Sequence, residues 1–413
     1  MSIEIVAIGH EVLHGMVVNT NAAFISAELE KAGWNVIRHT VLPDDSEQLE
    51  NGLREALKRA DFVITTGGLG PTCDDITRTI ASKIFESPVQ RDASLADELE
   101  KRFGKNLPSL DGLALAPVKA KRLLNRVGTA SGWLFSDNSR RLALLPGPPR
   151  EMTAMLTGEL IPQIASVLGV QPKKSVIRVS HLCSLREDDV DPFLRTLSAR
   201  YPSVHAGIYP GYGGLTVRFS GMVENDVQRC AEELERDFAT YLFSTPQGKI
   251  EEAIHSWFKE HKKTLAFGES CTGGKIASLI TALPGASEFF LGSLVAYSNQ
   301  LKRECLGVSE KTLNTYGAVS EEVVREMLAG IFKATGADWA IAVSGIAGPT
   351  GGSPDKPVGT VWGAIGERGK PAETAQMVLP LSRETIIAVS ANRLLGALWR
   401  KVRYGVPFRS FEK

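Results

Sequence analysis

The stretch DFVITTGGLGPTCDDITRTI, residues 61–80, contains an apolar strand, a glycine-rich turn and the start of a helix. Two further strands, each followed by a helix, precede it at residues 3–9 and 35–43. Continuous apolar runs such as 3–9 and 61–66 are typical of strands that are buried on both faces of a parallel sheet. The sequence therefore predicts an α/β fold whose amino-terminal part is a doubly wound, mostly parallel sheet.

The composition is that of a globular protein without a dominant charge. The chain has 413 residues, 43% hydrophobic and 23% charged, which predicts two or three domains. Its formal net charge of zero argues against nucleic acid as a partner. It begins without a basic flank, and no apolar run approaches the roughly 20 residues of a membrane span, so we expect neither a signal peptide nor a membrane partner.

The cysteines are odd in number and scattered, without a CxxC pair, which predicts reduced thiols and a cytoplasmic location. They are Cys73, Cys183, Cys230, Cys271 and Cys305.

Two linker-like segments, QPKK at 171–174 and PQGK at 246–249, divide the chain. We expect three domains, at residues 1–170, 175–246 and 250–410, of which the middle one is a small α+β module.

A cluster of glycines and acids follows the strand at 61–66. Glycines at the carboxyl end of a strand in such a sheet let backbone N–H groups approach a phosphate, and adjacent carboxylates suit a divalent metal. The alternative is that the acids only complement the dipole of the following helix. The residues concerned are Gly67, Gly68, Gly70, Asp74 and Asp75, with Glu11 at the end of the first strand.

Five motifs in this part resemble a known family. They are AIGHEVLHG, NTNAAF, TTGGLGPTCDDITR, GTASG and LPGPPREM, and their order is similar to the molybdopterin-binding-type domain of the competence/damage-inducible protein A (CinA) family. The resemblance implies a pyrophosphatase acting on ADP-ribose, in which the glycines hold phosphate and Asp74, Asp75 and Glu11 hold Mg²⁺ or a similar ion. Related molybdenum-cofactor enzymes offer pterin or nucleotidyl chemistry on the same fold as an alternative.

A second turn, ESCTGG at residues 269–274, contains two candidate nucleophiles. Cys271 would need a histidine, and the sequence from residue 250 onward offers only two, His255 and His261, both on the helix before the strand. Ser270 needs another base, for which Lys302 is suitable once its pKa is lowered. The alternative is a serine that caps a helix and a lysine that is only a surface charge.

The motifs around this turn are similar to the carboxyl-terminal domain of CinA proteins, the nicotinamide mononucleotide (NMN) deamidases. They are ESCTGG, LPGASEFFLGSLVAYSNQLK, YGAVSEEV and SGIAGPTGGSPDKPVGTV. The resemblance implies metal-free hydrolysis of NMN to nicotinic acid mononucleotide and ammonia. It makes Ser270 the nucleophile, Lys302 the general base and acid, and Tyr297 a proton relay. Backbone donors at Thr272, Gly273 and Gly274 and phosphate contacts at Gly348, Gly351, Gly352 and Lys356 are also implied.

The middle module occupies the place of a KH-like domain in the same family, in which the proteins are homodimers. Its GxxG string, residues 211–214, precedes a strand and contains no basic residue, which favours a hairpin turn over a nucleic-acid clamp. We expect a spacer or dimer arm here.

The whole chain is thus expected to be a bifunctional enzyme of pyridine-nucleotide salvage. The alternatives are a molybdopterin-type enzyme with a vestigial deamidase, and a non-enzymatic scaffold related to competence or DNA damage.

Overall fold

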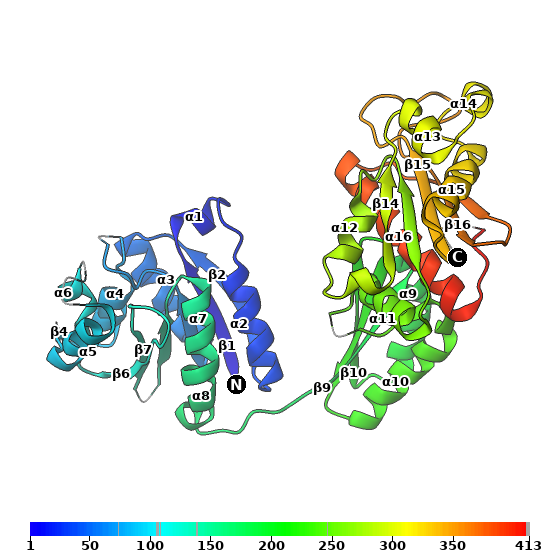
Figure 1. Ribbon diagram of the computed structural model, residues 1–413. Helices are drawn as coiled ribbons and strands as arrows, with labels where there is room; N and C mark the ends of the chain where they lie inside the picture. The colour runs from blue at the N-terminus through cyan, green and yellow to red at the C-terminus, as the bar shows by residue number, and fades with distance from the viewer. Residues whose placement is uncertain (73, 105–106, 108, 138, 246, 410–413) are drawn as a thin grey trace. The chain divides into compact units, whose positions relative to one another are not determined.

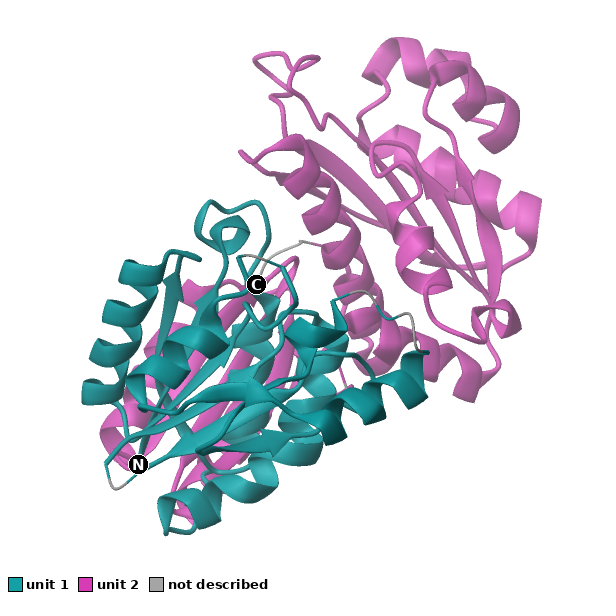
Figure 2. Ribbon diagram, turned by 90° about the vertical axis from the view of Figure 1, so that its left-hand side faces the viewer, with its two compact units in different colours: residues 1–175 teal, residues 176–413 magenta. Residues whose placement is uncertain are grey.

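The computed structural model describes residues 1–72, 74–104, 107, 109–137, 139–245 and 247–409, so Cys73 lies outside the described residues. The chain forms two compact units, Met1–Ser175 and Val176–Lys413 (Figure 2). In the described part of the chain, no helix is both long enough and apolar enough to cross a bilayer.

Unit 1 is built on a six-stranded sheet. Its order is β2 (Asn35–Leu42), β1 (Ser2–Ile8), β3 (Phe62–Thr66), β8 (Arg141–Leu145), β7 (Gly132–Ser136) and β6 (Ala120–Leu123). The first four strands are parallel, and β7 and β6 are added in antiparallel fashion. The mostly parallel sheet predicted from the apolar runs is therefore confirmed.

Helices cover both faces of this sheet (Figure 1). One core is formed under α2 (Thr20–Lys31), α7 (Pro149–Met155) and α8 (Ile161–Leu168). The other is formed under α3 (Ser46–Arg59), α4 (Thr77–Ile84) and α5 (Ala93–Phe103). Shorter elements complete the unit: α1 (His10–Leu13), β4 (Val89–Arg91), α6 (Leu110–Leu113) and β5 (Leu115–Pro117).

The N-caps of α2 and α3 differ in how well the sequence predicts them. Asn19 caps α2 by accepting from the Ala22 N–H at 3.1 Å. Ser46 would suit the same role in α3, but the cap is Asp45, whose carboxylate accepts from the Gln48 N–H at 2.9 Å. Two adjacent residues that both favour an N-cap position leave the boundary open by one residue.

The amino-terminal part of unit 2 is a four-stranded antiparallel sheet. Its order is β10 (Val204–Gly211), β11 (Gly214–Gly221), β9 (Val176–Cys183) and β12 (Leu242–Phe243). Apolar residues of α9 (Glu187–Arg200) and α10 (Glu224–Asp237) join its core. Gly211 pairs with Gly214 across a tight turn, so the GxxG string is a hairpin, as predicted.

The carboxyl-terminal part of unit 2 has a five-stranded sheet. Its order is β14 (Phe290–Val295), β13 (Leu265–Glu269), β15 (Trp339–Gly345), β16 (Thr360–Glu367) and β17 (Glu373–Val378). One face packs against α11 (Ile250–His261), α12 (Lys275–Thr281) and α16 (Arg383–Tyr404). The other packs against α13 (Asn299–Leu306), α14 (Glu310–Tyr316) and α15 (Glu321–Thr335).

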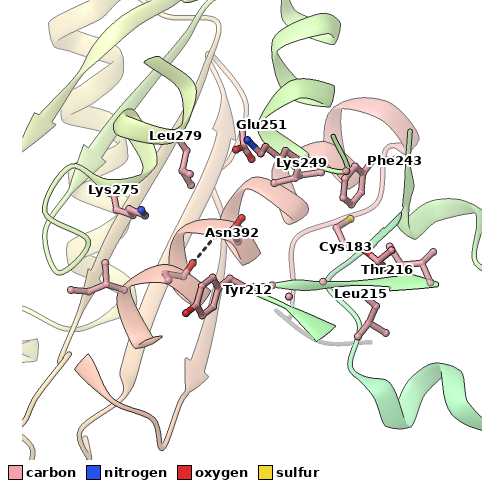
Figure 3. Close-up of a pocket in the computed structure, with 18 of the residues that line it drawn as sticks. Cys183, Tyr212, Leu215, Thr216, Phe243, Lys249, Glu251, Lys275, Leu279 and Asn392 are labelled. Atoms are coloured by element: carbon pink, nitrogen blue, oxygen red, sulfur yellow. Dashed lines mark hydrogen bonds between the residues drawn. The ribbon is translucent and has the colours of Figure 1, made fainter. Parts of the chain in front are cut away.

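The two parts of unit 2 meet along α16. The Trp399 indole donates to the Leu242 carbonyl at 2.7 Å, and the Cys183 thiol lies 3.7 Å from the Gly396 carbonyl. The tip of the β10–β11 hairpin also lies against α16 (Figure 3), because a Cβ atom added to Gly213 would be only 2.7 Å from the Asn392 Cβ. The middle part therefore packs on α16 of the carboxyl-terminal part instead of being joined to that part only by a linker.

Candidate active site

The turn after β13 begins the candidate site. Ser270 is the residue after this buried strand, and its N–H donates to the Val343 carbonyl of β15 at 3.1 Å. The chain then turns into α12 through Gly273 and Gly274, whose φ angles are 59° and 95°. Residues other than glycine rarely adopt these positive φ angles, so the two glycines allow the strand to turn directly into the helix.

Lys302 reaches the turn from α13. Its side chain is 1% exposed, and its Nζ lies 2.9 Å from the Ser270 Oγ. The Nζ also donates to the carbonyls of Ala296 at 3.0 Å and Tyr297 at 3.2 Å. Burial lowers the pKa of the Lys302 ammonium, because the charged form loses its hydration. Two of the residues singled out in the sequence therefore form a buried serine–lysine pair.

Tyr297 takes a different position from the one that a relay requires. Its carbonyl contacts Lys302, but its hydroxyl accepts from the Arg383 Nη2 at 2.9 Å. The Tyr297 side chain is 58% exposed. Arg383, the first residue of α16, also donates through Nη1 to the Gly348 carbonyl at 2.7 Å. The relay is not formed in this conformation, and an arginine outside every sequence motif joins the tyrosine to the loop after β15.

A buried carboxylate that the sequence analysis did not single out holds the turn together. Glu269 is 0% exposed. Its two oxygens accept five hydrogen bonds, from the Thr272 and Ser293 hydroxyls and the N–H groups of Gly274, Ile276 and Ala277, at 2.8–3.1 Å. The detectable signal was an acidic residue at the end of an otherwise apolar strand, since such a residue is seldom buried without partners.

The same bonds correct the expectation that three backbone donors face the substrate. The Gly274 N–H donates to Glu269, and the Gly273 N–H donates to the Ser270 carbonyl at 3.0 Å. Among the residues that the structure describes, no acceptor faces the Thr272 N–H. Gly273 and Gly274 thus shape the turn, and Thr272 is the remaining candidate donor of the three.

The loop between β15 and β16 is anchored by its lysine. Lys356, expected at a phosphate, donates through Nζ to the carbonyls of Tyr316 at 2.6 Å and Val319 at 2.8 Å. Its ammonium is thus engaged by the protein in this conformation. Gly348 is held by Arg383, whereas phosphate contacts of Gly351 and Gly352 stay predictions.

The cysteine alternative finds no support in the geometry. Burial raises the pKa of the Cys271 thiol to about 12, which disfavours the thiolate nucleophile. His255 lies 3.0 Å from the Pro284 carbonyl and His261 lies 2.8 Å from the Trp257 carbonyl. Among the described residues, neither histidine has a hydrogen bond to Cys271 or Ser270.

Unit 1 gathers its predicted residues around a cavity of about 450 Å³ at the carboxyl ends of β1, β3 and β8. Asn21 also borders this cavity. Its Nδ2 donates to the Thr66 hydroxyl and the Gly147 carbonyl, while its buried Oδ1 has no partner among the described residues. The lining includes all six predicted residues, Glu11, Gly67, Gly68, Gly70, Asp74 and Asp75.

The acids of this cavity fit a metal only together with a substrate. Asp75 accepts from the N–H of Thr72 at 2.9 Å and from its hydroxyl. No three acidic, histidine or cysteine side chains of the described residues form a ready-made metal cluster. Mg²⁺ in nucleotide sites commonly takes one or two carboxylates and completes its shell with phosphate oxygens and water. The donor set is compatible with that kind of site.

We expect Glu269→Gln to damage the turn more than its conservative size suggests. A carboxylate only accepts, whereas the amide NH₂ would face N–H donors and leave them unsatisfied. The expected loss is about 3 kcal/mol of unfolding free energy, measured by urea denaturation. Glu252→Gln, on α11, is the matched control and should be nearly neutral. Equal stabilities of the two variants would contradict the role of Glu269.

Comparison with known proteins supplies the family. The model described as CinA C-terminal domain matches residues 247–402, and that of the probable molybdopterin binding domain matches residues 4–166. A CinA-like protein of Thermotoga neapolitana is 37% identical over 87% of this chain and 88% of its own length. A putative competence-damage inducible protein of Symbiobacterium thermophilum is 36% identical over 90% and 89%.

One solved structure matches a smaller part. It is the competence damage-inducible protein A from Klebsiella pneumoniae subsp. pneumoniae MGH 78578, 38% identical, covering 38% of this chain and 96% of that chain with a TM-score of 0.37. The two full-length relatives match both halves of the sequence. The chain therefore belongs to the CinA family, with a molybdopterin-binding-like domain followed by a CinA carboxyl-terminal domain.

Proposed function

We propose that unit 2 is a serine–lysine amidohydrolase that converts NMN to nicotinic acid mononucleotide and ammonia. The observation that carries the proposal is the 2.9 Å separation of the Ser270 Oγ and the Lys302 Nζ at a buried turn. A serine without histidine needs such a base for acyl transfer. The choice of NMN rests on the motifs shared with the deamidase family.

The surroundings of Lys302 suit a neutral amine. A neutral amine keeps two N–H groups, one for each of the carbonyls of Ala296 and Tyr297, and its lone pair then faces the Ser270 hydroxyl. Lys302 takes the hydroxyl proton while the Ser270 Oγ attacks the carboxamide carbon. The Thr272 N–H is the candidate donor to the resulting oxyanion.

The intermediate collapses when the C–N bond breaks. Lys302 returns its proton to the leaving nitrogen, ammonia departs, and an ester joins the pyridine carbonyl to Ser270. Water then attacks this ester with Lys302 again as base, which releases nicotinic acid mononucleotide and restores Ser270. Arg383, fixed between Tyr297 and Gly348, is suited to orient the anionic substrate beside the loop.

For unit 1 we propose a metal-dependent pyrophosphatase acting on ADP-ribose. The supporting observation is one cavity that is lined by a glycine turn and carboxylates. Asp74, Asp75 and Glu11 would hold the divalent ion, which when bound would offset phosphate charge and activate water. The N–H groups of Gly68 and Gly70 would hold the phosphates, whereas the Gly67 N–H, also predicted to do so, already donates to the Leu145 carbonyl at 3.1 Å. The homodimer and the cytoplasmic location remain predictions.

Ammonia release from NMN tests the first proposal. Ser270→Ala and Lys302→Met should each lower kcat/KM by more than about a thousandfold, with or without chelator. Cys271→Ala and the exposed Lys311→Met serve as controls that retain activity. No ammonia from the wild type, or full activity in Ser270→Ala, would rule the assignment out.

The pH dependence of deamidation should report Lys302. Only its neutral form accepts the serine proton, so kcat/KM should rise with pH, with a midpoint below the ordinary lysine value of 10.5. Stability gives a second readout, because the unfolded lysine keeps its proton up to that value while the folded one loses it earlier. As the pH rises from the lowered pKa to 10.5, the unfolding free energy of the wild type should therefore increase relative to that of Lys302→Met. A constant difference would contradict the lowered pKa.

Cleavage of ADP-ribose in the presence of Mg²⁺ tests unit 1. Asp74→Asn and Asp75→Asn should lower the rate to the level of a chelated sample, because each removes a charged oxygen ligand. Deamidation of NMN by the same preparations is the control for folding and should be unchanged. Wild-type rates in both variants would show that these carboxylates hold no metal.

A further inference from the structure

Two sequence motifs of unit 1 meet at a carboxylate that has no role in the proposed reaction so far. The motifs are GTASG at residues 128–132 and LPGPPREM at residues 145–152. Glu151, from the second motif, lies in the first turn of α7 and borders the cavity of unit 1. Thr129 and Ala130, from the first motif, border the same cavity.

The turn before α7 brings Glu151 to the cavity from its own strand end. The predicted metal ligands follow β1 and β3, whereas Glu151 follows β8, the neighbour of β3 in the sheet. A Cβ atom added to Gly147 would lie 3.6 Å from the Gly67 Cα, so the turn after β8 packs on the glycine turn after β3. Glu151 therefore borders the cavity from the strand end next to the turn at which we propose that phosphate binds.

A buried amide orients the Glu151 carboxylate. Asn125 is 4% exposed, and its Nδ2 donates to the Glu151 Oε2 and, at 2.9 Å, to the Ala130 carbonyl. The Asn125 Oδ1 accepts from the N–H groups of Val127 at 3.1 Å and Gly128 at 2.8 Å. These bonds use both the donor and the acceptor side of the amide, so its orientation is fixed. The position of the Glu151 carboxylate is fixed with it.

The second oxygen of Glu151 is left for a partner outside the protein. Within the described ranges, Glu151 forms no ion pair, and the neutral Asn125 amide is the one group that donates to its carboxylate. Asp75, by contrast, already accepts from both the N–H and the hydroxyl of Thr72. A carboxylate that is held at one oxygen and paired with no cation is suited to take a proton from water.

Gly128 leaves the room that this carboxylate occupies. A Cβ atom added to Gly128 would overlap the carboxyl group of Glu151, whose carbon and two oxygens are the three atoms nearest to it. The φ angle of Gly128 lies outside the positive region, so its backbone conformation does not itself require glycine. The missing side chain at this position therefore serves the placement of Glu151.

We propose that Glu151 is the general base of unit 1, which takes a proton from the water that attacks the pyrophosphate. This role rests on the pyrophosphatase proposed above. A bond forms between the water oxygen and one phosphorus, and the bond from that phosphorus to the bridging oxygen breaks. The second phosphate leaves with the bridging oxygen and its electron pair. One proton of the water passes to the free oxygen of Glu151 and from there to solvent.

Glu151→Gln separates this role from a structural one. The carbonyl oxygen of the glutamine still accepts from the Asn125 Nδ2, but the amide is not a base. With ADP-ribose and Mg²⁺, kcat should fall by about a hundredfold or more, while KM stays close to that of the wild type. Glu159→Gln removes a carboxylate that pairs with Arg126 and does not line the cavity, so this control should keep the wild-type rate.

Two measurements without turnover accompany the kinetics of Glu151→Gln. The metal-free variant should unfold at the wild-type temperature, because the bond to Asn125 is kept. Calorimetric titration with ADP-ribose and Ca²⁺, which takes oxygen ligands as Mg²⁺ does, should give the wild-type affinity. A lowered unfolding temperature or a lowered affinity in place of the lowered kcat would show a structural or a binding role and overturn the proposal.

Gly128→Ala tests the placement of the carboxylate without removing it. The added methyl group displaces only the end of a flexible side chain, so kcat should fall by about tenfold or more with little loss of stability. Wild-type kcat in both Glu151→Gln and Gly128→Ala would overturn the role of Glu151 and leave the proposed pyrophosphatase intact. Failure of the wild type to cleave ADP-ribose would overturn both.

Discussion

The buried carboxylate of Glu269 is the constraint on which the site in unit 2 depends. Its five hydrogen bonds join the end of β13 to the turn, to the first residues of α12 and to Ser293 of β14. Since N–H groups at the start of a helix lack partners within the helix, a carboxylate there satisfies several at once. The turn is thereby rigid before any substrate arrives, and the position of Ser270 is fixed with it.

Burial of Lys302 then makes its amine a suitable base. Strand β13, which ends just before Ser270, lies beside β14, and the chain that follows β14 brings Lys302 back over the turn. Among the described residues, the hydrogen-bond partners of the amine are two carbonyls and one hydroxyl, and none of them is an anion. Desolvation therefore lowers its pKa without an opposing salt bridge. The same enclosure that disfavours the Cys271 thiolate favours a neutral lysine, so one environment selects serine over cysteine.

The fold could be predicted from local patterns, because apolar runs identify the strands and glycines mark the turns. The serine–lysine pair, whose members lie 32 residues apart, was predicted from the family resemblance, since the residues alone left a capping serine and a surface lysine as the alternative. Hydrogen-bond partners depend instead on tertiary contacts. For this reason the occupied N–H groups of Gly273 and Gly274, the Lys356 anchor and the contact of Arg383 with Tyr297 could not be predicted. Strand β10 is difficult to recognise from the sequence because Gly207 and Pro210 interrupt its apolar pattern.

The central claim is that the substrate passes through an ester on Ser270. Rapid acid quenching of the enzyme during NMN turnover, followed by mass spectrometry of its peptides, tests it most directly. The account predicts a pyridine-carbonyl nucleotide adduct on the peptide that contains Ser270, and its absence from Ser270→Ala. Ammonia production at the normal rate with no adduct on this serine, or an adduct on Cys271 instead, would contradict it.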